Sequence, residues 1–232
     1  MSLSASQLLT FVFSRADGAA RAWLQDAVTR AAAGQREALY SSYTAAPRRS
    51  GRQPLGLSGL ERQELAAAAP SVVFDRWTRE DAARAALLLA FAERAAADDF
   101  AATAIECYER GDSREQQSWL TALPLLPHAE RFLAVAIDAC RTNIVPQFEA
   151  IACDNPYPAR YFPQPNFNQL VLKSMFVGLA LDRIVGLGDR LNPELSRMAL
   201  DYAAERRAAG RSVPADLALA LTGDARTEEQ LR

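Results

Sequence analysis

Apolar residues recur along the chain at the spacing of helical faces. Between Ala129 and Cys140 they stand at i, i+3, i+4, i+7, i+8 and i+11, and a similar stripe begins at Leu195 and includes Met198 and Tyr202. This spacing gives each segment one apolar face and predicts amphipathic helices. The alternation that is typical of strands is nearly absent. The predicted fold class is therefore all-α.

Short polar motifs mark where the helices begin. Residues 78–81 read TRED and residues 112–115 read DSRE, and both place an acid three residues after a small polar residue, as in a capping box. Asn192 precedes Pro193, and proline is favoured at the first helical position because its missing N–H has no helical partner there. Glycines and the segment LPLLP at 123–127 end the helices after about ten to twenty residues.

Two predicted helix pairs follow each other, at 78–110 and 112–142. Their spacing of about 33 residues is close to the length of helical repeats, and the abundant alanines allow helices to approach closely. We expect an α–α superhelix of stacked antiparallel helix pairs, as in HEAT or armadillo proteins. An irregular helical bundle is the alternative.

The expected organisation is a single all-helical domain over residues 1–222. Residues 45–59, rich in Pro, Gly and Arg, are predicted to form a mobile connector whose Arg48, Arg49 and Arg52 point into water. The N-terminal segment has no positive charge before Arg15 and only a short apolar core. It is expected to be a first helix and not a signal peptide. Residues 223–232 are expected to be a frayed tail.

Composition narrows the classes of partner. The chain has 232 residues, a formal charge of −2 and a pI near 5.6, and it shows no basic stripe, so nucleic acid is not an expected partner. The longest uncharged apolar run near the middle, 85–92, is far shorter than the roughly 20 residues of a spanning helix, so the chain is not expected to cross a membrane. Three dispersed cysteines and one histidine indicate a reducing compartment, the cytoplasm, and exclude a Cys/His zinc cluster.

No catalytic motif of a familiar kind is present. The sequence lacks a Walker loop, a dinucleotide fingerprint, HExxH and GxSxG, and VGLGDR at 185–190 follows a helix, so it is expected to be a turn. His128 is expected to pack at a helix start, and the thiols of Cys107, Cys140 and Cys153 are expected to be structural. No catalytic residue, metal site or cofactor is predicted.

The segment CDNPYPARYFPQPNFNQLVLK, residues 153–173, differs from the rest of the chain. Pro156, Pro158, Pro163 and Pro165 fix four backbone angles, and residues 155–165 are therefore predicted to be a stiff, non-helical loop. Such a loop either braces the fold or presents polar groups for recognition.

From Asn166 the pattern is helical. Asn166, Gln169 and Lys173 fall on one face with Phe176 or Val177, while the opposite face can pack inward; its residues are Leu170, Val171, Ser174 and Met175.

Lys173 is the one lysine of a chain with 26 basic residues. Because its neighbours are apolar and an unpaired buried charge is costly, its ammonium is expected to pair with a carboxylate such as Asp154 or with an anionic ligand.

The same segment resembles the EboA family. The resemblance lies in the pattern NPYP…YFP followed by NQ.VLK..F, which here is Asn155 to Pro158, Tyr161 to Pro163, Asn168, Gln169, Val171 to Lys173 and Phe176. Gln164 stands where an acid is expected in the family. The Trp23-Leu24 pair, the Arg-rich connector and the length agree with the resemblance.

The resemblance implies a member of a bacterial gene cluster of helical-repeat-like proteins that move a secondary-metabolite precursor toward the periplasm. Its neighbours would include a UbiA-like membrane prenyltransferase, a sugar-phosphate cyclase-like enzyme and TIM-barrel proteins. No catalytic activity is implied.

Three hypotheses remain open at this point. The first is a non-enzymatic carrier of a small metabolite, with a pocket formed by the aromatic and polar residues of the segment: Asn155, Tyr157, Tyr161, Phe162, Asn166, Asn168, Gln169 and Lys173. The second is a helical scaffold for pathway proteins. The third is an enzyme that uses Lys173 or Asp154. In the first, Asn168 and Gln169 face a cavity, but amides at such a junction can instead cap backbone groups.

Overall fold

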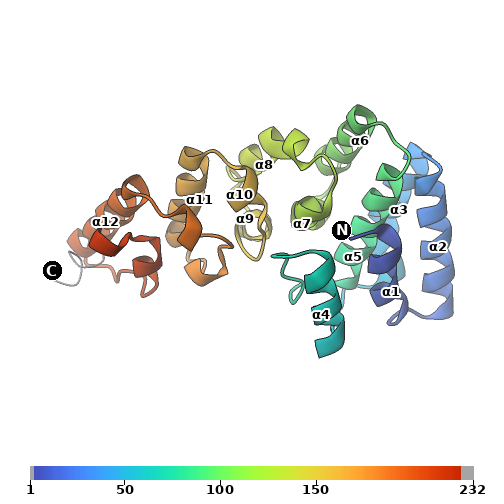
Figure 1. The fold of residues 1–232 in the computed structure, drawn as a ribbon, viewed down its shortest axis with the longest axis horizontal. Helices are drawn as coiled ribbons and strands as arrows, with labels where there is room; N and C mark the ends of the chain where they lie inside the picture. Colours follow the sequence, from blue (N-terminus) through green and yellow to red (C-terminus); the bar gives the residue numbers. More distant parts are fainter. Residues whose placement is uncertain (1–2, 226–232) are drawn as a thin grey trace. The chain divides into compact units, whose positions relative to one another are not determined.

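The computed structural model describes residues 3–225 and consists of helices joined by short connections (Figure 1). Within that range no β-strand occurs, and one isolated bridge joins Pro54 to Thr78. The all-α prediction is confirmed. No helix in these residues has both the length and the apolar character required to cross a membrane.

The helices follow one another along the whole described range. The α-helices are α1 (Ala5–Phe13), α2 (Gly18–Ala32), α3 (Arg36–Ser50), α4 (Gly59–Ala68), α5 (Arg79–Ala92), α6 (Ala97–Glu109), α7 (Ser113–Ala122), α8 (Leu133–Ala139), α9 (Val145–Ala152), α10 (Tyr157–Tyr161), α11 (Gln164–Val177) and α12 (Pro193–Ala208). The 3-10 helices are η1 (Leu123–Leu125), η2 (Ala129–Phe132), η3 (Leu181–Arg183), η4 (Gly188–Arg190) and η5 (Leu217–Ala220).

The chain divides into two compact units, Met1–Asp138 and Ala139–Arg232, here called unit 1 and unit 2. The single domain over residues 1–222 stays a prediction, because two compact units can still fold as one domain. The stacking of helix pairs into a superhelix also stays a prediction. Most of the expected frayed tail, residues 226–232 of 223–232, lies outside the described residues.

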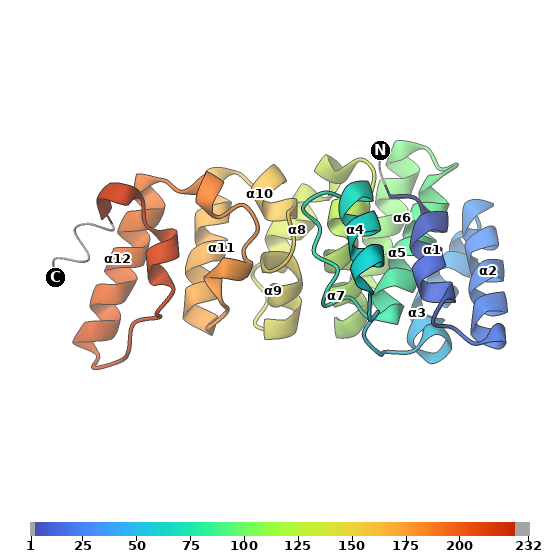
Figure 2. The same ribbon diagram turned by 60° about the horizontal axis from the view of Figure 1, so that its bottom comes forward.

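Unit 1 is built around α5, which contacts α1, α2, α3 and α7 (Figure 2). Every residue from Glu80 to Phe91 is buried. The helix begins at the predicted capping box, in which Thr78 and Asp81 each accept a hydrogen bond from the other's backbone N–H. Alanine fills much of its surface, and small side chains let four helices approach one central helix closely.

Unit 2 has α11 at its centre, in contact with α9 and α12 (Figure 2). The predicted inward face of α11 is confirmed, because Leu170, Val171, Ser174 and Met175 are all buried. The start of α12 is also as predicted: the Asn192 side chain accepts the Leu195 N–H, with Pro193 at the first helical position.

The predicted connector at 45–59 is shorter than expected, because α3 continues to Ser50. Pro47 lies inside this helix and cannot donate to the carbonyl of Tyr43, four residues earlier. The buried Arg84 Nε donates to that carbonyl instead, at 3.0 Å. The remaining connector is attached to the start of α5, because the Leu55 N–H donates to Trp77 O and the Arg79 N–H donates to Gln53 O.

The prediction that residues 155–165 form no helix is wrong. Residues Tyr157–Tyr161 form α10, and α11 begins at Gln164. Pro158 and Pro165 each lie in a first helical turn, and Pro163 is the N-cap residue of α11. At these positions the backbone N–H has no helical partner, so proline removes no hydrogen bond from the helix.

Candidate functional site

Several side chains of the Pro-rich segment are buried in unit 2. Asn155 is buried and ties the turn together: its Nδ2 donates to Ala150 O at 2.9 Å, and its Oδ1 accepts the Tyr157 N–H at 3.0 Å. The ring of Tyr157 is fully buried and lies 4.7 Å from the ring of Tyr161 and 6.3 Å from the ring of Phe162. These side chains form part of the core of unit 2, with Tyr161 at its exposed edge.

A cluster of amides joins α11 to the start of α12. Asn168 and Asn192 exchange hydrogen bonds at 2.9 and 3.2 Å, and Gln164 Nε2 also donates to Asn168 Oδ1. Gln164 Oε1 accepts from Arg190 Nε, so an amide at this position pairs with an arginine. Asn168 therefore links α11 to the start of α12 through its side-chain amide.

The ammonium of Lys173 binds two backbone carbonyls. Its Nζ lies 2.6 Å from Cys140 O and 2.6 Å from Thr142 O, just beyond the end of α8, and 4.7 Å from the centre of the Phe148 ring. The expected ion pair with Asp154 is absent, because Asp154 pairs with Arg183 at 2.5 Å. The carbonyls at a helix C-terminus attract cations, which accounts for the position of this ammonium.

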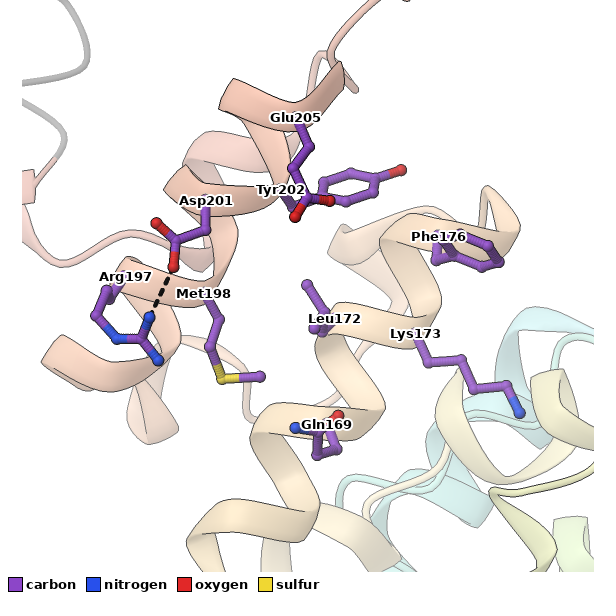
Figure 3. A pocket seen from close by; sticks show the side chains of 9 residues that line it. All are labelled: Gln169, Leu172, Lys173, Phe176, Arg197, Met198, Asp201, Tyr202 and Glu205. Carbon is purple, nitrogen blue, oxygen red and sulfur yellow. Dashed lines mark hydrogen bonds and ion pairs between the residues drawn. The ribbon is translucent and has the colours of Figure 1, made fainter. Parts of the chain in front are cut away.

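A pocket of about 530 Å³ lies between α11 and α12 (Figure 3). Residues of α11 form one wall and residues of α12 the other: Gln169, Leu172, Lys173, Phe176, Arg197, Met198, Asp201, Tyr202 and Glu205. Figure 3 shows the stem of Lys173 at the pocket and its ammonium directed away from α12. The Tyr202 hydroxyl donates to Met175 O at 3.2 Å and holds the two helices together behind the pocket.

The charged groups of the pocket differ in how they are paired. Arg197 donates to both carboxylate oxygens of Glu194 and to Asp201 Oδ2 at 2.6 Å. The hydrogen bond from Arg197 lowers the pKa of Glu194 below its ordinary value. Glu205 has no hydrogen-bond or ion-pair partner for its side chain among residues 3–225. Phe176 projects its ring into solvent with 74% of the residue exposed.

A comparison with protein families decides which group the chain is part of. The family described as "Metabolite traffic protein EboA" matches residues 5–222. The chain belongs to the EboA family. No curated protein and no solved structure matches this EboA protein. The match extends over nearly the whole chain, far beyond the segment that carries the resemblance, and the family's description assigns a role in metabolite traffic.

The predicted site residues of this EboA protein separate into two groups. Gln169 and Lys173 line the pocket, together with Phe176 of the same predicted face. Asn155, Tyr157, Tyr161, Phe162, Asn166 and Asn168 do not line it. The wall formed by α12 was not predicted, although Met198 and Tyr202 were expected on the apolar stripe of that helix. Nothing in the charged residues of α12 distinguishes a pocket wall from an ordinary solvated face.

Two of the three cysteines of this EboA protein have poorly reactive thiols. Burial raises the pKa of Cys107 and of Cys140 to about 12, so both remain protonated, poorly nucleophilic thiols at neutral pH. His128 is exposed and has a backbone φ of 57° at the start of η2. Residues 3–225 contain no group of three or more His, Cys, Asp or Glu side chains that could hold a metal ion.

Proposed function

We propose that this EboA protein binds a small, largely apolar metabolite between α11 and α12 and takes part in its traffic without transforming it. The observation that carries the proposal is the pocket between these helices. Its volume falls in the range of about 300–1,000 Å³ that is usual for small-molecule sites. Leu172, Met198 and Phe176 supply apolar walls, and a few polar groups stand at the edges, as such sites require.

The Pro-rich segment has a supporting role in this proposal. The buried Asn155 and Tyr157 anchor the turn before α11, and Asn168 fixes α11 to the start of α12. Rigid walls lose little conformational entropy when a ligand binds. Gln169 and the aliphatic stem of Lys173 then contact the metabolite directly.

The finer features of the function are also proposals. The protein would act in the cytoplasm on a secondary-metabolite precursor that moves toward the periplasm, beside pathway proteins that include a membrane prenyltransferase. The family's description as a metabolite traffic protein supports the general direction of this proposal.

The pocket is tested by replacing Phe176 with alanine and isolating the protein from its own host for native mass spectrometry. We expect a small-molecule adduct on the wild type that is lost or strongly reduced in Phe176→Ala. The melting temperature should be nearly unchanged, since exposed substitutions usually alter stability by less than about 0.5 kcal/mol.

Leu60→Ala is the matched control, because Leu60 in α4 of unit 1 is also 74% exposed and lines no part of this pocket. It should retain the adduct. If the wild type carries no adduct and pathway proteins co-purify equally with both variants, the protein is a scaffold and the binding proposal fails.

A further inference from the structure

The charges around the pocket between α11 and α12 indicate which kind of molecule it accepts. Two cationic side chains line it, and the cationic groups of both already have hydrogen-bond partners. The Lys173 ammonium binds two carbonyls at 2.6 Å, and Arg197 contacts the carboxylates of Glu194 and Asp201 at 2.7 and 2.6 Å. An incoming anion would have to compete with these contacts.

The acidic side of the pocket is different. Asp201 is paired with Arg197, whereas the side chain of Glu205, one turn further along α12, has no partner among the described residues. Arg206, the nearest further cation in sequence, donates to Ser212 O at 2.5 Å and contacts the Tyr202 hydroxyl at 3.4 Å. The carboxylate of Glu205 is thus the one charged group among the described residues of this pocket whose side chain makes neither a hydrogen bond nor an ion pair.

The opposite wall adds an aromatic face. Figure 3 shows Phe176 on α11 and Glu205 on α12 toward the same end of the pocket, with Gln169 toward the other end. An exposed aromatic ring attracts cations through its negative face. The Tyr202 ring already has the Arg206 guanidinium 5.8 Å from its centre, whereas no cation from residues 3–225 lies over the ring of Phe176.

We propose that the pocket between α11 and α12 selects a small molecule that combines an apolar ring with a cationic amine. The apolar part lies against Leu172 and Met198, and the ammonium group lies between Glu205 and the ring of Phe176. This inference rests on the proposed function and specifies the ligand class of the same site.

Three probes with one ring system and different charges test the selection. They are naphthylmethylamine, which is a cation at neutral pH, naphthylmethanol, which is neutral, and naphthoate, which is an anion. Binding of each to the full-length chain is measured by isothermal titration at low and at high salt. We expect the amine to bind about fivefold more tightly than the alcohol, because an exposed ion pair and a cation–π contact are each modest. Naphthoate should bind most weakly.

Variants locate the source of the preference. Glu205→Gln should reduce the preference for the amine to less than about twofold, since only the ion pair is removed and the walls remain. Glu37→Gln is the charge-matched control, because Glu37 is an exposed carboxylate of α3 in unit 1 without a described partner, and it should leave the preference intact.

The outcomes separate this inference from the proposed function. If the three probes bind equally, if naphthoate binds best, or if Glu205→Gln keeps the full preference, the cation selectivity is wrong while the pocket stands. If no probe binds the wild type, or if Phe176→Ala leaves all binding unchanged, the pocket itself is wrong and both proposals fail.

Discussion

Lys173 shows how a single charged side chain can hold a turn in place. The carbonyls of Cys140 and Thr142 lie beyond the end of α8, where the helix leaves backbone acceptors without N–H partners. The ammonium satisfies both acceptors, and the ring of Phe148 covers it at 4.7 Å. The same side chain contributes its aliphatic stem to the pocket, so one residue connects the stability of unit 2 with the proposed binding site.

Replacing this residue tests its structural role. Lys173→Met keeps the apolar stem but removes both hydrogen bonds, and we expect the free energy of unfolding to fall by about 1.5–3 kcal/mol, the range for hydrogen bonds to charged groups. Chemical denaturation measures the change. Gln169→Met, one turn earlier on the same face, removes no described hydrogen bond and is the control. If the Lys173→Met variant is as stable as the wild type, the Lys173 ammonium does not stabilise the turn after α8.

The sequence identified Lys173 as unusual but did not identify its partner. The apolar neighbours of Lys173 predicted a carboxylate or an anionic ligand as its partner, whereas its ammonium donates to two uncharged backbone carbonyls. The choice between Asp154 and the backbone carbonyls at 140 and 142 depends on how the turns of unit 2 fold back on α11. No local pattern contains that information, and Asp154 is instead held by Arg183.

At the scale of elements, α3 continues through a proline because another helix supplies the missing donor. Arg84 of α5 is buried, and it donates to Tyr43 O, to Glu80 and to Ser118. Pro47 alone would weaken the last turns of α3. The length of α3 therefore depends on a side chain from α5, which contacts it in the core of unit 1.

This dependence predicts a coupling between positions 47 and 84. Arg84→Met should destabilise the protein by about 3–5 kcal/mol, because it also leaves the buried Glu80 with a weaker set of partners. Pro47→Ala restores an N–H that can donate to Tyr43 O. The effect of Pro47→Ala on the free energy of unfolding should be about 1 kcal/mol more favourable in the Arg84→Met background than in the wild type. Denaturation of the four proteins of this double-mutant cycle measures the difference, and strictly additive changes would refute the coupling.

Element starts were predicted better than element lengths. The caps at Thr78, Asp112 and Asn192 occur as predicted, because capping is a local interaction between residues a few positions apart. The extent of α3 and the existence of α10 were not predicted. A proline in a first helical turn and a proline in an extended loop look alike in sequence, and only the packing of Tyr157 into the core of unit 2 favours the helix.

At the scale of the whole molecule, the boundary between the two units lies between Asp138 and Ala139, at the last residue of α8. The connector at 140–144 that follows is largely exposed, as is usual where two units of a chain join. The prediction of a single domain over residues 1–222 therefore depends on whether the two units unfold together. The three tryptophans, Trp23, Trp77 and Trp119, all lie in unit 1, so tryptophan fluorescence reports on that unit alone.

A single domain predicts that fluorescence and far-UV circular dichroism follow the same thermal unfolding curve, because coincident transitions are the signature of all-or-none unfolding. Lys173→Met makes the test sharper, since the substitution lies in unit 2 and the fluorescent reporters lie in unit 1. In a cooperative domain it should lower the midpoint seen by fluorescence as much as the midpoint seen by circular dichroism. If the fluorescence midpoint stays at its wild-type value while part of the helical signal melts earlier, the two units unfold independently and the single-domain prediction is wrong.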